Sequence, residues 1–229
     1  MPGLRRALTG LLLLGAVRPA LAQDVRDPLE AVNRRVHWFN SAVQAHVLGP
    51  AAEFYRATAP AELRTGVANA FANLGEPLTA VSGLLAGELD VAANAMLRFS
   101  INSTFGIAGI QDRAASLGYP RQGFTAADAL CRWGVPSGPF VVLPLLGPST
   151  LRDAGAMAVT TVALSQALGS DYVMTWSTGS ALAGYAELHP ELRRIEAQAL
   201  DSYAVYRSLY LQQRAATCAS DRVMEAETE

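Results

Sequence analysis

The chain of 229 residues is rich in apolar side chains, at 51%, and poor in charged ones, at 17%. Its formal net charge is −2, and arginine supplies all 18 of its basic residues. Without a basic surplus the chain has little electrostatic attraction for a phosphate backbone, which argues against a nucleic-acid-binding protein. The length allows one sizeable core and does not require two domains.

Residues 1–22 have the order of a secretory signal peptide. Arg5 and Arg6 supply a positive start, a short leucine-rich segment follows, and an Ala-Leu-Ala cleavage site ends at Ala22. The apolar segment is too short to span a bilayer. We therefore expect cleavage after Ala22 and export from the cytoplasm. Because no cysteine precedes Cys131, we expect no lipid-modified cysteine at the cleavage site.

The chain contains two cysteines, Cys131 and Cys218. Export would place them where disulfides are permitted, so they could pair. Residues 218–229 are polar and acidic and predict a disordered tail, so the plainer interpretation is two unpaired thiols. The cysteines and histidines have unrelated spacings, so we expect no metal and no cofactor. Residues 23–217 read as one helical domain without an internal boundary.

Apolar residues at helical spacing predict a chain of helices with almost no strand. Asp27, Pro28 and Glu30 suit the N-cap, first and third positions of the first helix, which is expected to end before Gly49. Irregular chain is expected over residues 107–124. Further helices are predicted at residues 51–57, 60–74, 77–87, 88–104 and 126–133, the last with Thr125 as its N-cap.

The stretch from Gly138 to Leu146 is apolar but cannot be helical. Pro139 and Pro144 fix φ at about −65° and remove backbone donors, so the stretch must run extended or turned. Thr150 and Asp153 follow as a capping box, with a hydroxyl and a carboxylate three residues apart. We expect an uncharged hairpin that leads into a capped helix and contacts something apolar.

The helices expected at residues 150–167 and 172–186 lie in a region that is almost free of charge. Between Trp133 and Ala186 the chain carries three charged residues. A helix on the surface of a soluble protein normally carries charge on its outer face, so these two are either buried in protein or exposed to lipid. At about 1.5 Å per residue each is short for a single-pass span, and a position within one leaflet suits them better.

The last helix is expected from Pro190 to about residue 216 and is amphipathic. Tyr203, Tyr206 and Tyr210 recur at helical spacing on it. Such a stripe could grip a partner or lie at the level of lipid headgroups. Core packing with the hydroxyl groups at the rim is the favoured interpretation.

Motifs of catalysis are absent from the sequence. It lacks a Gly-x-Ser-x-Gly elbow, a phosphate loop, a Gly-x-Gly-x-x-Gly fingerprint and a His-Glu-x-x-His motif. His37 is expected to be hydrogen-bonded and partly buried rather than a base. Arg152 and Asp153 form an ionisable pair in an apolar region, which indicates either a functional site or a structural helix start. We predict that the protein is not an enzyme.

Ordered motifs from about Asp27 to about Gln213 resemble the MlaA/VacJ family, an outer-membrane component of the system that maintains lipid asymmetry in Gram-negative envelopes. The resemblance implies an all-α, ring-like single domain around an amphipathic central channel, with the Pro/Gly-rich hairpin beside it. The family-motif residues with structural roles are Asp27, Pro28, Asn33, Arg34, Phe39, Asn40, Pro77, Asn102, Gly106 and Asp112.

The resemblance also implies which residues lie at the lipid channel. Its hairpin motif continues through the start of the following helix. The implied lipid-channel and hairpin residues are Gly138, Pro139, Phe140, Leu143, Pro144, Leu146, Gly147, Arg152 and Asp153.

In function, the resemblance implies intermembrane phospholipid transport. Family members remove phospholipids that have strayed to the outer leaflet and pass them to a soluble periplasmic carrier, MlaC, without covalent chemistry. Trimeric porins are their usual partners in the outer membrane. We therefore expect a location on the periplasmic face of the outer membrane. The lack of a cysteine for lipid attachment departs from many members, so the alternative is a soluble periplasmic helical lipid-binding protein.

Overall fold

The computed structural model describes residues 27–226, with side chains to Cys218, so the predicted signal peptide, residues 1–22, lies outside the described residues. Helices form most of this part of the chain. In chain order the elements are α1 (Glu30–Val43), the π-helical turn η1 (Gln44–Leu48), α2 (Gly49–Thr58), α3 (Ala61–Ala86), α4 (Leu89–Thr104), α5 (Arg113–Ser116), α6 (Ala126–Arg132), β1 (Phe140–Leu143), β2 (Gly147–Thr150), α7 (Leu151–Leu168), α8 (Ser170–Gln198) and α9 (Ser202–Ala226).

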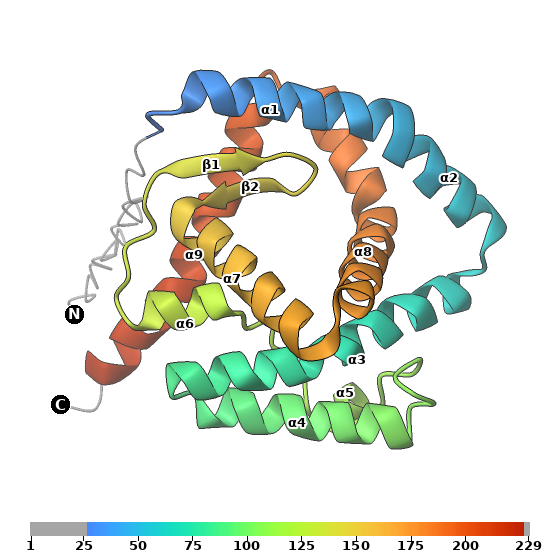
Figure 1. Ribbon diagram of the computed structural model, residues 1–229. Helices are drawn as coiled ribbons and strands as arrows, with labels where there is room; N and C mark the ends of the chain where they lie inside the picture. Colours follow the sequence, from blue (N-terminus) through green and yellow to red (C-terminus); the bar gives the residue numbers. More distant parts are fainter. Residues whose placement is uncertain (1–26, 227–229) are drawn as a thin grey trace, which may run out of the picture.

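The helices form a frame around a hairpin and one further helix (Figure 1). In this view α1 and α2 make the upper side, α3 and α4 the lower side, and α6 with α9 the left side. Helix α8 makes the right side and contacts α2 and α3, while the β1–β2 hairpin and α7 lie within the frame. The prediction of an all-α, ring-like single domain is confirmed.

The predicted hairpin is the one sheet in the described residues. Strands β1 and β2 pair antiparallel, with Phe140 opposite Thr150 and Leu143 opposite Gly147. Leu145 and Gly147 turn the chain with positive φ values of 65° and 85°. A leucine is unfavourable at such a φ because its Cβ is crowded, so this turn needs support from outside the hairpin.

Several predicted helix boundaries are wrong because tertiary contacts carry helices through residues that usually end them. Pro77 lies inside α3, Pro190 lies inside α8, and η1 continues α1 through Gly49 into α2. A proline inside a helix removes one hydrogen bond and frees the carbonyl four residues earlier. In α8 that carbonyl belongs to Ala186, and Arg56 Nη1 donates to it at 3.1 Å. A contact from another helix thus replaces the missing one.

Helix α1 does not begin with the predicted cap. It starts at Glu30 with Leu29 in the N-cap position and no side-chain capping bond. The Asp27 carboxylate instead accepts a hydrogen bond from Asn33 Nδ2 at 2.8 Å and another from the hydroxyl group of Tyr203. The assignment of Asp27 as N-cap is therefore wrong. Its carboxylate instead links Asn33 on α1 to Tyr203 on α9.

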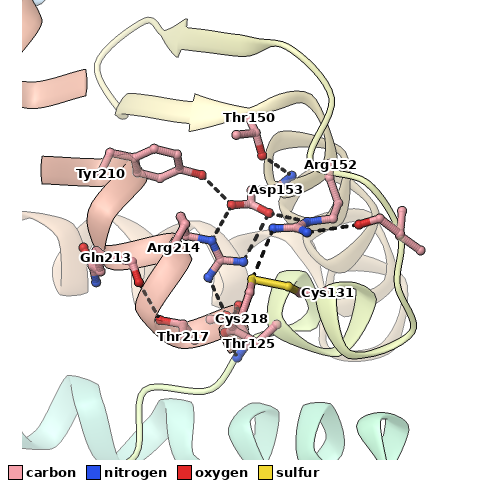
Figure 2. The surroundings of a disulfide bond; sticks show 12 residues. Thr125, Cys131, Thr150, Arg152, Asp153, Tyr210, Gln213, Arg214, Thr217 and Cys218 are labelled. Atoms are coloured by element: carbon pink, nitrogen blue, oxygen red, sulfur yellow. Dashed lines mark hydrogen bonds and ion pairs between the residues drawn. A yellow bond between two sulfur atoms is a disulfide. The ribbon is translucent and has the colours of Figure 1, made fainter. Parts of the chain in front are cut away.

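The two cysteines form a disulfide, so the interpretation as unpaired thiols is wrong. Cys131 on α6 is bonded to Cys218 on α9, with their Cα atoms 6.0 Å apart (Figure 2). The pairing is possible because α9 runs on to Ala226, so residues 218–226 are helical where the sequence predicts a disordered tail. The disulfide fastens the last helix to the middle of the chain and helps to close the frame.

Removing this disulfide should destabilise the frame markedly. The bond joins residues 87 positions apart, and cross-links of this kind typically contribute about 2–4 kcal/mol by restricting the unfolded chain. We expect the Cys131→Ser/Cys218→Ser variant to lose about that much free energy of unfolding in a urea titration. Reductant should lower the stability of the unaltered protein to the same level and leave the variant unchanged. If the variant and the unaltered protein were equally stable without reductant, the prediction would be contradicted.

Candidate functional site

The hairpin is attached to α1 by two buried asparagines. Asn33 Nδ2 donates to the Phe140 carbonyl at 3.0 Å, and its Oδ1 accepts from the Val142 N–H at 2.9 Å. Asn40 lies seven positions later on the same helix face. Its Nδ2 donates to the Leu143 carbonyl at 2.9 Å and its Oδ1 accepts from the Leu145 N–H at 2.7 Å. The two amides therefore take the place of a third strand.

The Asn40 side chain also supports the strained turn, since it holds the N–H of the leucine with positive φ. Replacing Asn40 with Ala should leave two hairpin backbone groups without a partner, at a cost of about 1–3 kcal/mol. We expect hydrogen exchange of the Leu145 amide to accelerate about tenfold or more. Exchange at Val142, held by Asn33, should be unaffected. The Asn40→Asp variant keeps the acceptor and should preserve protection at Leu145; equal exchange in both variants would refute the role.

The first residue of β1 faces the core. Phe140 is fully buried, with its ring centroid 6.2 Å from that of Tyr203 and 6.1 Å from that of Tyr210. Burial and the neighbouring Asp27 carboxylate raise the pKa of Tyr203, while burial and Asp153 raise the pKa of Tyr210 to about 12. The core interpretation of the tyrosine stripe is confirmed for these two residues. Phe140 offers no surface to a ligand, contrary to its predicted place at the channel.

The tip of the hairpin has the opposite character. Leu145 and Leu146 are exposed by 61% and 63%. Pro144 is also exposed, whereas Leu143 and Gly147 are partly buried. Of the predicted hairpin set, Pro144 and Leu146 at the tip and Gly138 at the base are exposed.

The base of the hairpin is fixed by backbone bonds to the start of α7. The Pro139 carbonyl accepts from the Leu151 N–H at 3.1 Å, and the Ser137 carbonyl accepts from the Arg152 N–H at 3.0 Å. Gly138 has a positive φ of 69°, and a Cβ there would lie 3.2 Å from the Cβ of Leu151. Glycine thus lets the chain turn close to α7.

Arg152 and Asp153 belong to a partly buried ionic cluster beside the disulfide (Figure 2). Asp153 accepts from Arg152 Nε at 2.9 Å, lies 2.8 Å from Arg214 Nε, and accepts from the Tyr210 hydroxyl group. Arg214 also pairs with Asp128 on α6. One half of the capping box is present, since the Asp153 N–H donates to the Thr150 hydroxyl at 3.4 Å. These contacts favour the structural interpretation of the pair.

A second ionic cluster lies between α3 and α4, away from the hairpin. The Arg98 side chain is fully buried, and its Nε lies 2.7 Å from Glu76 Oε1. Its Nη2 lies 3.0 Å from Asp112 Oδ2, and its Nη1 donates to the Tyr119 carbonyl at 2.6 Å. Burial opposes ionisation of Asp112, but the hydrogen bonds from Arg98 and Asn102 hold its pKa below the usual value. Glu76 was not identified from the sequence. The one feature that could have indicated its role is its position as an acidic residue in an otherwise apolar stretch of helix.

The irregular segment after α4 is folded back onto that helix by other predicted motif residues. Asn102 Nδ2 donates to Asp112 Oδ1 at 3.1 Å, and Asn102 Oδ1 accepts from the Ala114 N–H at 2.9 Å. A Cβ on Gly106 would lie 2.3 Å from the Gln111 carbonyl oxygen, so only glycine fits there. These residues hold the segment after α4 against that helix and so help to build the frame.

The remaining sequence-predicted residues lie on or next to α1. Pro28 is in the turn before the helix. Arg34 pairs with Asp201 at 2.9 Å in an exposed position. Phe39 is half-exposed. His37 is half-buried and lies 2.9 Å from the Ser202 hydroxyl group, and burial lowers its pKa, so its predicted structural character is confirmed.

Helices α7 and α8 expose the uncharged surface that their sequence predicts. In α7 only Ala156 is buried among the described residues, while Val159 and Val162 are exposed by 71% and 61%. Met174 on α8 is exposed by 71%. The alternative that these helices are buried within the protein is therefore wrong. Elsewhere in the described part of the chain the most exposed large apolar side chains are Leu200, Phe105, Trp38, Phe54 and Leu89.

Two further findings concern the whole described part of the chain. Over the described part of the chain, no helix is both long and apolar enough to cross a membrane. In the same part, no three His, Cys, Asp or Glu side chains lie where they could jointly hold a metal ion.

The chain is similar to proteins of one family. The sequence model described as MlaA lipoprotein matches residues 25–217. An uncharacterised protein of Rickettsia felis is 35% identical over 142 residues, which are 62% of this chain and 57% of that protein. The Escherichia coli intermembrane phospholipid transport system lipoprotein MlaA is 32% identical over 207 residues, 88% of this chain and 78% of that protein.

Structural comparison agrees with the sequence matches. A solved chain, from work on the structural basis for maintenance of bacterial outer membrane lipid asymmetry, superimposes with a TM-score of 0.73 at 28% identity. The superposition covers 84% of this chain and 99% of that chain. The family model's match over residues 25–217 spans the frame and the hairpin, and the chain belongs to the MlaA lipoprotein family.

Proposed function

We propose that this protein transports phospholipids between membranes, removing mislocalised phospholipids from the outer leaflet of the outer membrane. The observation that carries the proposal is the uncharged, exposed surface of α7 and α8 beside an apolar hairpin tip. Family membership supports it, because relatives from Escherichia coli and Haemophilus influenzae are named intermembrane phospholipid transport system lipoproteins. The transport is retrograde and maintains lipid asymmetry.

The exposed apolar side chains support residence in the periplasmic half of the outer membrane. Transferring a large apolar side chain from water to hydrocarbon contributes about 1.5–3 kcal/mol. Val159, Val162 and Met174 alone therefore offer several kcal/mol if α7 and α8 contact lipid. Export through a cleaved signal peptide at residues 1–22 would bring the chain to this location.

Transport in this proposal needs no covalent step. An amphipathic channel beside the hairpin would accept the acyl chains, with Leu145 and Leu146 at its mouth as the moving part. Arg152 and Asp153 would hold the base of the hairpin in place through their ionic cluster. A soluble MlaC-type carrier would take up the released lipid in the periplasm, and a trimeric porin would hold the frame in the membrane.

Whole-cell labelling tests the proposed transport. Deleting the gene should increase the labelling of surface aminophospholipids by an amine reagent that does not cross membranes, and a plasmid copy should reverse the increase. Unchanged labelling after deletion would refute lipid removal. Fractionation of the envelope tests the location: protein found wholly in the soluble periplasm would favour the alternative, a soluble lipid-binding protein.

A disulfide across the hairpin tip tests whether the hairpin moves. The Asn40 side chain lies against the Leu145 backbone, with Oδ1 2.7 Å from the N–H, so Asn40→Cys/Leu145→Cys is the cysteine pair chosen to fasten the tip to α1. We expect the stapled protein to reach normal abundance but to fail in the labelling assay. Each single cysteine variant is its control. Full lipid removal by the stapled protein would exclude the hairpin as a moving gate.

A further inference from the structure

An open pocket of about 470 Å³ lies where α2 meets α8, away from the hairpin. Four of its side chains are charged or strongly polar, two from each helix. The lining residues are Glu53, Arg56, Ala57, His189, Pro190 and Arg193.

The pocket forms where both helices depart from regular geometry. Helix α2 follows the π-helical turn η1, and such turns frequently occur at functional sites. A Cβ on Gly49 would lie 3.0 Å from His189 Cε1, so glycine allows the buried histidine to approach α2 closely. On the other side Pro190 frees the Ala186 carbonyl, to which Arg56 donates. The irregularities of α2 and α8 thus place Arg56 at this junction.

The pocket presents two guanidinium groups and one carboxylate. Arg56 uses Nη1 for both of its hydrogen bonds, to the Ala186 carbonyl and to Glu187. Arg193 Nη1 pairs with Glu53. A guanidinium carries five N–H donors in a planar fork, so each arginine retains donors on its other nitrogens. Such forks match the oxygens of a phosphate group.

The distribution of charge along α8 places this pocket at a boundary. From Tyr172 to Ala186 the helix carries no charge, whereas Glu187, Glu191 and Arg193 follow within two turns. If the uncharged half lies in hydrocarbon, the first charged turn lies at the depth of the lipid phosphates. The pocket occupies that turn.

We propose that this pocket binds a phosphate group, supplied by a phospholipid headgroup or as free phosphate. The lipid source rests on the proposed transport function, while phosphate binding itself does not. Arg193 provides the exposed, adjustable contact and Arg56 the fixed one. Glu53 opposes the phosphate charge and competes with the phosphate for Arg193, with which it pairs.

Titration of the full chain in a sugar-headgroup detergent tests the proposal, with inorganic phosphate and a short-chain phosphatidylcholine as probes. Arg193→Gln should weaken binding of both probes about tenfold through the loss of a charge-assisted contact. Arg194→Gln is the matched control. Arg194 is adjacent, exposed by 63% against 68% for Arg193, and paired with Glu191 at 2.5 Å, yet lies outside the pocket lining. Its binding should equal that of the unaltered protein.

A variant that is expected to raise the affinity for phosphate strengthens the test. Glu53→Gln removes the opposing charge and releases Arg193, so inorganic phosphate should bind more tightly. Equal affinities of the Arg193→Gln and Arg194→Gln variants would overturn the proposal, as would the absence of saturable binding of either probe. Saturation by an acidic peptide but not by phosphate would also overturn it and assign the pocket to a protein partner.

The same experiment distinguishes the two sources of phosphate. Tighter binding of the lipid than of inorganic phosphate supports a headgroup site, and equal or weaker binding supports free phosphate. Labelling of surface aminophospholipids reports separately on transport. If gene deletion raises labelling while Arg193→Gln and Arg194→Gln bind alike, the pocket proposal alone fails. If deletion leaves labelling unchanged while Arg193→Gln binds weakly, the transport proposal alone fails.

Discussion

We expect the replacement of both Val159 and Val162 with aspartate to release the protein from the outer membrane without unfolding it. The two residues lie three positions apart on one face of α7 and are largely exposed. In water such surface changes alter the free energy of unfolding by about 0.5 kcal/mol each, and valine and aspartate have similar helix propensities. In hydrocarbon each aspartate costs about 2–3 kcal/mol, enough in combination to lower membrane partitioning more than 100-fold.

Envelope fractionation and flotation with liposomes measure this effect. The matched control is Ala197→Asp, an exposed position in the charged part of α8, which should remain with the membrane. Circular dichroism of all variants should be the same. If the Val159→Asp/Val162→Asp protein floats with liposomes as the unaltered protein does, α7 does not contact lipid. That result would contradict the prediction.

The second large effect concerns stability: Arg98→Met lowers the free energy of unfolding by about 3–5 kcal/mol. The Arg98 side chain is fully buried, and its partner Glu76 is exposed by only 3%. Removing the guanidinium leaves that carboxylate buried without its closest counter-charge. The desolvation cost of an unpaired buried charge is larger than the net contribution of the ion pair to the free energy of unfolding, which explains the size of the effect.

Urea unfolding compares three variants. Arg121→Gln is the control, because Arg121 is 41% exposed and lies 3.7 Å from the same Glu76 oxygen; it should cost less than about 1 kcal/mol. Adding Glu76→Gln to Arg98→Met should recover part of the lost stability, because it neutralises the buried charge. A loss below about 1 kcal/mol for Arg98→Met, or no recovery in the double variant, would contradict this account.

Features set by neighbouring residues were predictable. Thr125 and Thr150 stand before α6 and α7 as expected, because a cap depends on groups within three positions: Asp128 accepts from the Thr125 N–H at 2.7 Å. Pro139 and Pro144 restrict their own backbone, so the hairpin could be placed as well. The absence of charge from residues 154–170 and 172–186 is a property of composition, and it predicted an apolar surface that the structure exposes.

Features set by distant residues were missed or misassigned. Helix α8 continues through Pro190, where Arg56 from α2 donates to the freed Ala186 carbonyl. Cys131 meets Cys218 where α9 stays helical. The sequence shows that Asn33 and Asn40 lie seven positions apart, but it does not show that both side chains bind the backbone of the hairpin.

Local propensities amount to about 1 kcal/mol or less per residue, so buried hydrogen bonds, ion pairs and a cross-link between remote segments override them. The order of residues along the chain was sufficient to predict the helical class, the hairpin and the exposed apolar surface of α7 and of the first half of α8. Tertiary contacts alone decided where helices end, which thiols pair, and how the hairpin is fastened to α1.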